Sequence, residues 1–187
     1  MQKKPIIINQ RLPLHILEVA LLSYLKNRYS RDYVQERLAL EFKGENRIKK
    51  ASNLVNKVIL NNSISGFIEE HKEAILNALK KKDDRNLILI SMVNSTFPFA
   101  FDLLSTIGKY FAVQEIISTE AIKKTISGIY GGNRSMENAL YAVIPMFIEA
   151  GFFEREKAGI YRFGEDLKPL FDISYQIYLE SFRASCS

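Results

Sequence analysis

The chain has 187 residues, of which 47% are hydrophobic, and a formal net charge of +5 at pH 7. This length suits one or two globular domains, each able to bury a core. The longest uncharged stretch, residues 86–101, is too short and too polar to span a membrane, and residues 1–10 lack the apolar core of a signal peptide. The lone cysteine, Cys186, excludes an internal disulfide, so we expect a soluble cytoplasmic protein.

The charge is distributed unevenly along the chain. Residues 1–85 contain 17 Lys and Arg against 10 Asp and Glu, whereas residues 86–187 contain 9 against 11. A run of charged residues at 80–85 lies where the balance changes. We therefore expect a basic helical domain over residues 1–85 and a slightly acidic domain over residues 86–187.

The first half predicts a basic, mobile arm over residues 1–11, followed by helices. Apolar residues at helical spacing place these helices at 12–25, 31–42, 47–60 and 67–79, and Ser30 is suited to cap the second. A short turn at 43–46 separates the second and third helices. Helix, short turn and helix is the order of a helix-turn-helix.

The third of these helices is amphipathic. Ile48, Ala51, Val55, Val58 and Ile59 fall on its apolar face. A helix that enters the major groove needs such a face to hold it on its domain, and exposed Arg, Lys and Asn to reach phosphates and base edges. An ordinary solvated face is the alternative. The candidate DNA contacts are Arg47, Lys49, Lys50, Asn53, Asn56 and Lys57.

The second half opens with a very apolar helix over residues 87–93, capped by Asp84 and buried on several sides, and a helix over 97–111. Ser118 is suited to cap a third helix, which the glycines at 131–132 end. Ser135 then caps a fourth, which stops at Gly151. Residues 152–163 change to alternating polarity around a turn at 157–159, which predicts a β-hairpin. From residue 97, the order of three helices and a hairpin is that of a winged helix.

The winged-helix-like domain offers a second, weaker set of DNA contacts. Glu137, Glu154 and Glu156 lie among its members and would repel phosphate. A last helix over residues 166–182 has a broad apolar surface, and closing the core or packing across a homodimer axis remain open alternatives for it. The second set of contacts comprises Asn133, Arg134, Asn138, Tyr141, Arg155 and Lys157.

No arrangement of residues points to catalysis. The glycines at 131–132 lack the lysine and the preceding strand of a phosphate-binding loop. Two histidines and one cysteine do not make a zinc site, and no histidine lies in a recognisable arrangement with a nucleophile. The sequence therefore predicts a mainly α, non-enzymatic protein without a metal or cofactor.

The chain also resembles the BrxA family of BREX bacteriophage-defence systems. The resemblance spans roughly residues 30 to 155 and rests on spacing and hydrophobic pattern in three stretches, from Tyr33 to Leu60, Leu87 to Asp102 and Met146 to Phe153. It implies a helical DNA-binding accessory protein that works beside other defence proteins and has no enzymatic activity of its own. It implies no individual functional residue, since the family has no catalytic motif to transfer.

These patterns predict a protein that binds double-stranded DNA, either as a defence accessory or as a regulator. The alternative is an interaction scaffold, in which the winged helix docks a protein and the last helix dimerises. RNA binding by the helical domain also remains open. Salt dependence separates the first two, because each phosphate contact steepens the loss of affinity with salt.

Overall fold

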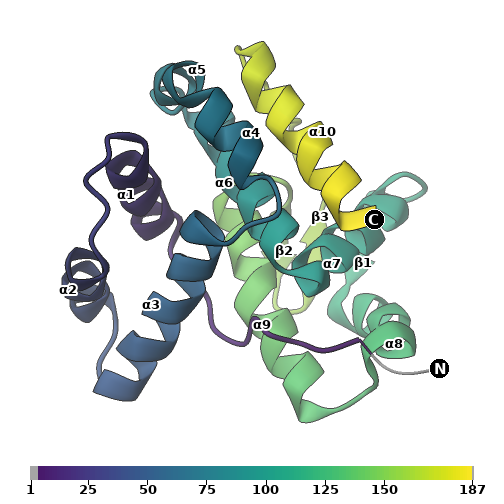
Figure 1. The fold of residues 1–187 in the computed structure, drawn as a ribbon. Coiled ribbons are helices and arrows are strands. Elements are labelled where there is room, and N and C mark those ends of the chain that lie inside the picture. The colour runs from purple at the N-terminus through teal and green to yellow at the C-terminus, as the bar shows by residue number, and fades with distance from the viewer. Residues whose placement is uncertain (1–3, 187) are drawn as a thin grey trace. The chain divides into compact units, whose positions relative to one another are not determined.

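The computed structural model describes residues 4–186, and Figure 1 labels its helices and strands. The chain divides into two compact units: unit 1 comprises Met1–Arg11 and Phe97–Leu167, and unit 2 comprises Leu12–Thr96 and Lys168–Ser187. The structure is mainly helical with a small antiparallel sheet, which confirms the mainly α prediction. The boundary expected between residues 85 and 86 falls inside a helix, Lys82–Thr96.

Unit 2 is built around one buried helix. Every residue from Leu87 to Val93 is buried, as the apolar composition of this segment predicts. Helices α1 (Leu14–Leu25), α3 (Glu45–Leu60) and α10 (Asp172–Cys186) pack against it. The helices of unit 2 are α1 (Leu14–Leu25), α2 (Arg31–Glu41), α3 (Glu45–Leu60), α4 (Ser65–Glu70), α5 (Lys72–Ala78), the central α6 (Lys82–Thr96) and α10 (Asp172–Cys186).

Helices α1, α2 and α3 pack pairwise on one another. The Ser30 hydroxyl accepts a hydrogen bond from the Tyr33 backbone N–H at 3.3 Å, which confirms the predicted cap of α2. Tyr33 is exposed, whereas Val34 and Leu38 are buried. The turn into α3 is made by Gly44, whose φ of +94° favours glycine.

The helix expected over residues 67–79 is two short helices, α4 and α5, separated at His71. The His71 ring stacks on Phe67 with 4.2 Å between ring centroids, and its Nδ1 donates to the Phe67 carbonyl at 2.9 Å. That carbonyl also accepts the backbone N–H of His71, so the imidazole competes with the helical hydrogen bonding at the break.

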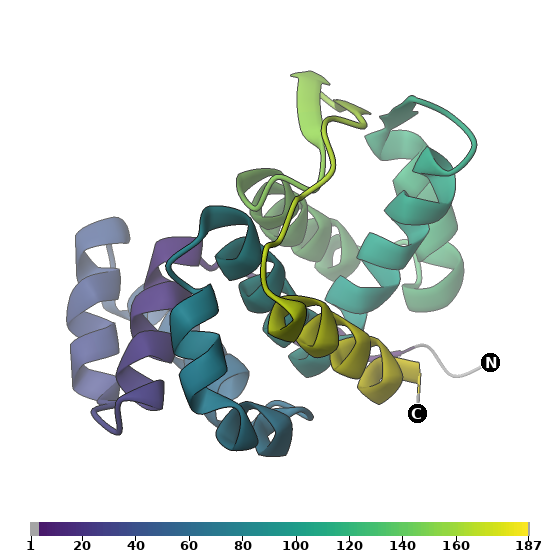
Figure 2. The ribbon, with the colours of Figure 1, turned by 90° about the horizontal axis from the view of Figure 1, so that it is seen from above.

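The start of α10 differs from the prediction because of Asp84. This residue does not cap α6, which begins at Lys82; its carboxylate is fully buried. The carboxylate accepts hydrogen bonds from the backbone N–H groups of Leu170 (3.0 Å) and Phe171 (2.9 Å) and from the Ser174 hydroxyl (2.7 Å). The chain therefore enters α10 in an extended conformation, and the helix begins at Asp172 instead of residue 166 (Figure 2).

Unit 1 combines three helices with a three-stranded antiparallel sheet in the order β1-β3-β2. The hairpin of β2 and β3 confirms the change of period in the sequence. Strand β1 was not expected; it pairs with β3, with Ile117 opposite Tyr161. Along the chain the elements are α7 (Pro98–Phe111), β1 (Ile116–Ser118), α8 (Thr119–Tyr130), α9 (Arg134–Glu149), β2 (Glu154–Lys157) and β3 (Ile160–Arg162).

The caps of α8 and α9 are made by local side chains. The Ser118 hydroxyl accepts from the Ala121 N–H at 3.1 Å, as predicted. For α9, the prediction of Ser135 is wrong, because the Asn133 side chain accepts from the Met136 N–H at 3.0 Å. Asparagine is as good an N-cap as serine, so composition alone does not separate the two.

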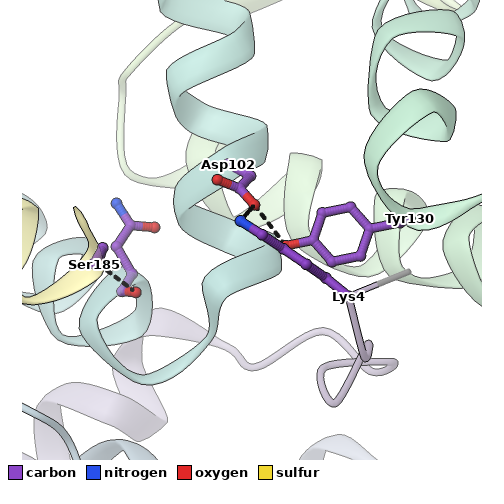
Figure 3. Close-up of polar contacts among 5 residues, drawn as sticks. Lys4, Asp102, Tyr130 and Ser185 are labelled. Atoms are coloured by element: carbon purple, nitrogen blue, oxygen red, sulfur yellow. Dashed lines mark hydrogen bonds and ion pairs between the residues drawn. The ribbon is translucent and has the colours of Figure 1, made fainter. Parts of the chain in front are cut away.

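The N-terminal arm is held on unit 1, which contradicts the prediction of a mobile arm for residues 4–11. Ile8 is fully buried. The Lys4 ammonium lies 2.9 Å from an oxygen of Asp102, and this oxygen also accepts from the Tyr130 hydroxyl at 2.7 Å (Figure 3). The Arg11 guanidinium lies 2.6 Å from the Glu149 carboxylate. The remaining residues of the predicted arm, 1–3, lie outside the described residues.

Candidate nucleic-acid interface

Helix α3 has one buried and one exposed face. Ala51, Val55 and Val58 are completely buried. Successive residues of a helix turn by about 100°, which gathers the polar residues at 46, 49, 50, 53 and 57 within about 100° of its circumference. All five are exposed. We call them the α3 row: Asn46, Lys49, Lys50, Asn53 and Lys57.

The lysines of the α3 row are not neutralised. Within the part of the chain that the structure describes, Lys49, Lys50 and Lys57 form no ion pair with an acidic side chain. The only acidic residue of α3, Glu45, lies in its first turn. Elsewhere in unit 2, Arg85 is paired with Glu18 at 3.3 Å. The row thus keeps a positive charge that an anion can reach.

Two of the predicted α3 contacts lie away from this row. The Arg47 guanidinium sits 4.7 Å from the centre of the Phe42 ring, and Arg47 is exposed at the edge of α3, about 100° around the helix from the middle of the row. Asn56 is buried, and its side-chain oxygen accepts a hydrogen bond from the Tyr29 hydroxyl. The prediction that Asn56 faces solvent is therefore wrong, because Tyr29 covers the margin of the apolar face.

Asn46 was missed as a member of the row, because the sequence placed it in the turn before the helix. The helix begins two residues earlier than expected, at Glu45. The signal that could have found Asn46 is its position four residues before Lys50, which puts both side chains on the same face once the helix is extended.

Helix α9 presents a second polar row. Arg134, Asn138 and Tyr141 are exposed along its first half, and Tyr141 is 67% exposed. Glu137, expected to repel phosphate, lies 2.5 Å from the Lys123 ammonium. The hydrogen bond to Glu137 raises the pKa of Lys123 above its usual range. Asn133 is occupied as the N-cap of α9, so its side-chain oxygen already accepts a bond from the protein.

The hairpin of unit 1 carries mixed charge. Arg155 and Lys157 are exposed on β2, with a bulge between them, and they alternate with the exposed Glu154 and Glu156. The Glu156 carboxylate lies 3.0 Å from the Arg162 guanidinium on the neighbouring strand. The predicted contacts of this hairpin therefore lie on a surface of nearly balanced charge, unlike the α3 row.

Two further features of the described residues bear on chemistry. A shallow pocket of about 260 Å³ lies between α8 and α9, with Lys123, Lys124, Glu120 and Glu137 in its lining. No group of three or more His, Cys, Asp and Glu side chains among residues 4–186 is placed to hold a metal ion. Within the same range, none of the helices combines the length and the apolar character needed to cross a membrane.

Comparisons with protein-family models, with curated proteins and with solved structures found no significant match for this chain. The resemblance to the BrxA family remains a prediction from the three stretches described above.

Proposed function

We propose that this chain is a non-enzymatic protein that binds double-stranded DNA, with the α3 row as its principal contact. The observation that supports this most is the row itself: three lysines that have no acidic partner among residues 4–186 share one exposed face of a helix with two asparagines. The opposite face of that helix is fixed by packing against α1, α2 and α6. A rigidly held helix with such a face meets the steric and electrostatic needs of the major groove.

Each side chain of the row has a defined task in this proposal. The ammonium groups of Lys49, Lys50 and Lys57 bind phosphates and release condensed counterions, which provides affinity without sequence preference. The Asn53 and Asn46 amides each offer a donor and an acceptor, which suits the edge of adenine or a phosphate oxygen. Arg47, at the edge of α3, adds a phosphate contact beside the groove.

Unit 1 contributes a second and weaker contact in this proposal. Its order of α7, β1, α8, α9, β2 and β3 and its antiparallel sheet agree with a winged helix, in which the last helix and the hairpin approach DNA. Arg134 and Asn138 on α9, and Arg155 and Lys157 on the hairpin, would make the contacts. Glu154 and Glu156 on the same hairpin reduce their attraction for phosphate.

The first test is fluorescence anisotropy of the full chain with a labelled DNA duplex at 50 and 200 mM salt. Affinity should fall roughly 40-fold over this range for three phosphate contacts and roughly 150-fold for four. Affinity that is unchanged by salt would contradict the proposal. Tighter binding to an RNA duplex or to single strands than to DNA would move the assignment to RNA.

The alternative is an interaction scaffold, and the balanced charge around α9 and the hairpin favours it for unit 1. Tyr141 gives that surface an exposed aromatic side chain of the type enriched at protein interfaces. If the chain fails to bind duplex DNA even at 50 mM salt, a protein-docking role replaces the DNA-binding one.

For the biological role, we propose an accessory factor of bacterial phage defence acting with other defence proteins, or a transcriptional regulator. The resemblance of residues 30–155 to the BrxA family supports the first. Deleting the chain from its host should then raise the plating efficiency of phage, and re-expression should restore resistance. Unchanged plating, with altered transcription of neighbouring genes, would favour the regulator.

A further inference from the structure

Helix α10 has an exposed apolar face within unit 2. Its opposite face is buried against the unit through Ile173 and Ile177. Leu179 is the eighth of the 15 residues of α10, and its side chain is 54% exposed. At about 100° per residue, Leu179 also lies in the middle of the exposed face around the helix. Leu179 is thus the centre of the apolar face both along the helix axis and around its circumference.

The two edges of this face differ in chemistry. Tyr175 and Phe182, seven residues apart, form one edge and are 47% and 46% exposed. Asp172, Gln176 and Arg183 form the other edge, and all three are exposed. Leu179 lies between the aromatic edge and the polar edge. The acidic residue, Asp172, is at the start of the polar edge. The basic residue, Arg183, is near its end and also pairs with Glu180 of its own helix at 2.6 Å.

We infer that α10 pairs with the α10 of a second copy of this chain in an antiparallel arrangement, about a two-fold axis near Leu179. In an antiparallel two-fold pair each edge of a helix meets the same edge of its partner. The aromatic edges therefore pack on one another, and the polar edges pair with one another. A parallel two-fold pair would instead place each aromatic edge against the polar edge of the partner.

The charges of the polar edge are complementary in the same arrangement. Asp172 and Arg183 are separated by 11 residues, or about 16 Å along the helix. Reversing the partner helix about Leu179 places Asp172 and the partner's Arg183 on the same side of the interface, offset along the axis by three residues, or about 4.5 Å. The long arginine side chain can bridge this offset, and the two-fold symmetry repeats the contact for Arg183 and the partner's Asp172. In a parallel pair, the polar edge of each helix would face the aromatic edge of its partner, so neither Asp172 nor Arg183 would meet an opposite charge. Shape and charge thus select the same occupant and direction.

The inference does not depend on DNA binding and is tested with the full chain alone. Sedimentation velocity over a range of concentrations should show a monomer–dimer equilibrium. Leu179→Lys removes the central apolar contact and places two like charges beside the axis, so it should weaken dimerisation about 100-fold. The control is Leu40→Lys, a leucine of α2 that is 77% exposed and lies outside α10; it should leave the dimer intact.

Two outcomes of this experiment would overturn the inference. One is a wild-type chain that stays monomeric at every concentration. The other is a Leu179→Lys variant that dimerises as well as the wild type, since the dimer would then use another surface. Thermal unfolding of each variant shows whether the fold is retained. A destabilised Leu179→Lys variant is replaced by Leu179→Gln, for which weaker dimerisation is again expected and unchanged dimerisation again overturns the inference.

Exchanging the charges of Asp172 and Arg183 tests whether the two α10 helices of the dimer are antiparallel. Asp172→Arg alone should weaken the dimer about tenfold, because it breaks both intermolecular ion pairs and brings like charges together. Arg183→Asp should have a similar effect on the dimer and also removes the ion pair with Glu180 of the same helix. The double variant Asp172→Arg/Arg183→Asp should recover most of this loss. Failure of the double variant to recover affinity would overturn the antiparallel pairing.

The single cysteine gives an independent readout. Cys186 is the last residue of α10 and is exposed. An antiparallel pair holds the two Cys186 residues at opposite ends, about 20–25 Å apart, whereas a parallel pair brings them level. If the pair is antiparallel, mild oxidation should not link the two Cys186 thiols within the α10 dimer. Any disulfide-linked dimer that does form should then be equally abundant in the wild type and in Leu179→Lys. A disulfide-linked dimer that is lost in Leu179→Lys would indicate a parallel pair and overturn the inference.

Discussion

Each unit includes a segment that is distant in sequence from the rest of the unit, and different interactions hold the two segments in place. In unit 1, the arm is held by ion pairs of Lys4 with Asp102 and Arg11 with Glu149, whose cations remain about half exposed. In unit 2, the entry to α10 is held by the fully buried carboxylate of Asp84. Exposed ion pairs contribute about 0–1 kcal/mol each, whereas leaving buried donors without an acceptor costs about 1–3 kcal/mol each.

The units also differ in what their exposed helices offer an anion. The lysines of the α3 row have no acidic partners among the described residues, while the cations of α9 and the hairpin lie among Glu137, Glu154 and Glu156. The proposed DNA affinity should therefore reside mainly in unit 2. The local pairing of each cation thus identifies the helix that offers an unneutralised charge, whereas the net charge identifies only the half of the chain that contains it.

The largest effect is expected at the buried carboxylate of unit 2. Asp84→Ala leaves two backbone N–H groups and the Ser174 hydroxyl without their acceptor, so the free energy of unfolding of unit 2 should fall by about 4 kcal/mol. Urea denaturation, monitored by amide hydrogen exchange in each unit, measures the free energy of unfolding of unit 2 separately from that of unit 1. Asp83→Ala is the matched control, because the Asp83 carboxylate accepts a hydrogen bond from Lys168 N at 3.0 Å and is not completely buried. Equal losses for the two variants would contradict this view of Asp84.

Reversing charge in the α3 row should have the largest effect on DNA. Lys49→Glu with Lys50→Glu removes two phosphate contacts and adds two repulsions, so affinity for a duplex at 50 mM salt should fall about 100-fold. Both residues are exposed, so the unfolding temperature should not change. The matched control is Lys80→Glu with Lys81→Glu, the same change of charge at exposed residues outside α3. If the control loses as much affinity, net charge rather than the α3 row determines binding.

The hydrogen bond from the Tyr29 hydroxyl to Asn56 should stabilise the packing of α3 on unit 2. Burial raises the pKa of the Tyr29 hydroxyl from its ordinary 10.0 to about 12. The stability it provides is therefore complete below pH 10 and is lost as the pH rises from 10 to about 12. Tyr29→Phe leaves the Asn56 oxygen without its donor and should cost about 1 kcal/mol at pH 8. A pH dependence above pH 10 that is unchanged in this variant would contradict the assignment.

The smallest effect is expected in unit 1. Arg134→Glu with Arg155→Glu reverses two charges, as in the α3 double variant, but the acidic residues around them already weaken their attraction for phosphate. DNA affinity at 50 mM salt should fall only about threefold. A loss larger than that of Lys49→Glu with Lys50→Glu would reverse the comparison and make α9 the principal contact.

Local signals in the sequence predicted most elements of the fold. The caps at Ser30 and Ser118, the glycines at 131 and 151 and the change of period after residue 152 act within a few residues, so they are legible without tertiary structure. Strand β1 escaped because three residues are too few to show alternation, and it exists only through its pairing with β3.

The part of the candidate site that the sequence predicted is the part that local helical spacing determines. Helical spacing placed Lys49, Lys50, Asn53 and Lys57 on one face, because rotation about a helix axis is fixed by the backbone. The same spacing left Asn56 at the margin of that face. Its burial depends on Tyr29, which lies 27 residues away along the chain.

The sequence by itself determined that this protein is mainly helical, that α6 is buried and that α3 has a basic face, since periodicity and composition act locally. Tertiary structure decided that the arm is held on unit 1, that the chain enters α10 in an extended form and that α10 belongs with residues 12–96. Each of these results depends on contacts between residues about 85 to 140 positions apart, such as Asp84 with Phe171 and Arg11 with Glu149. No local pattern encodes such a contact, because its partner is chosen only when the chain packs.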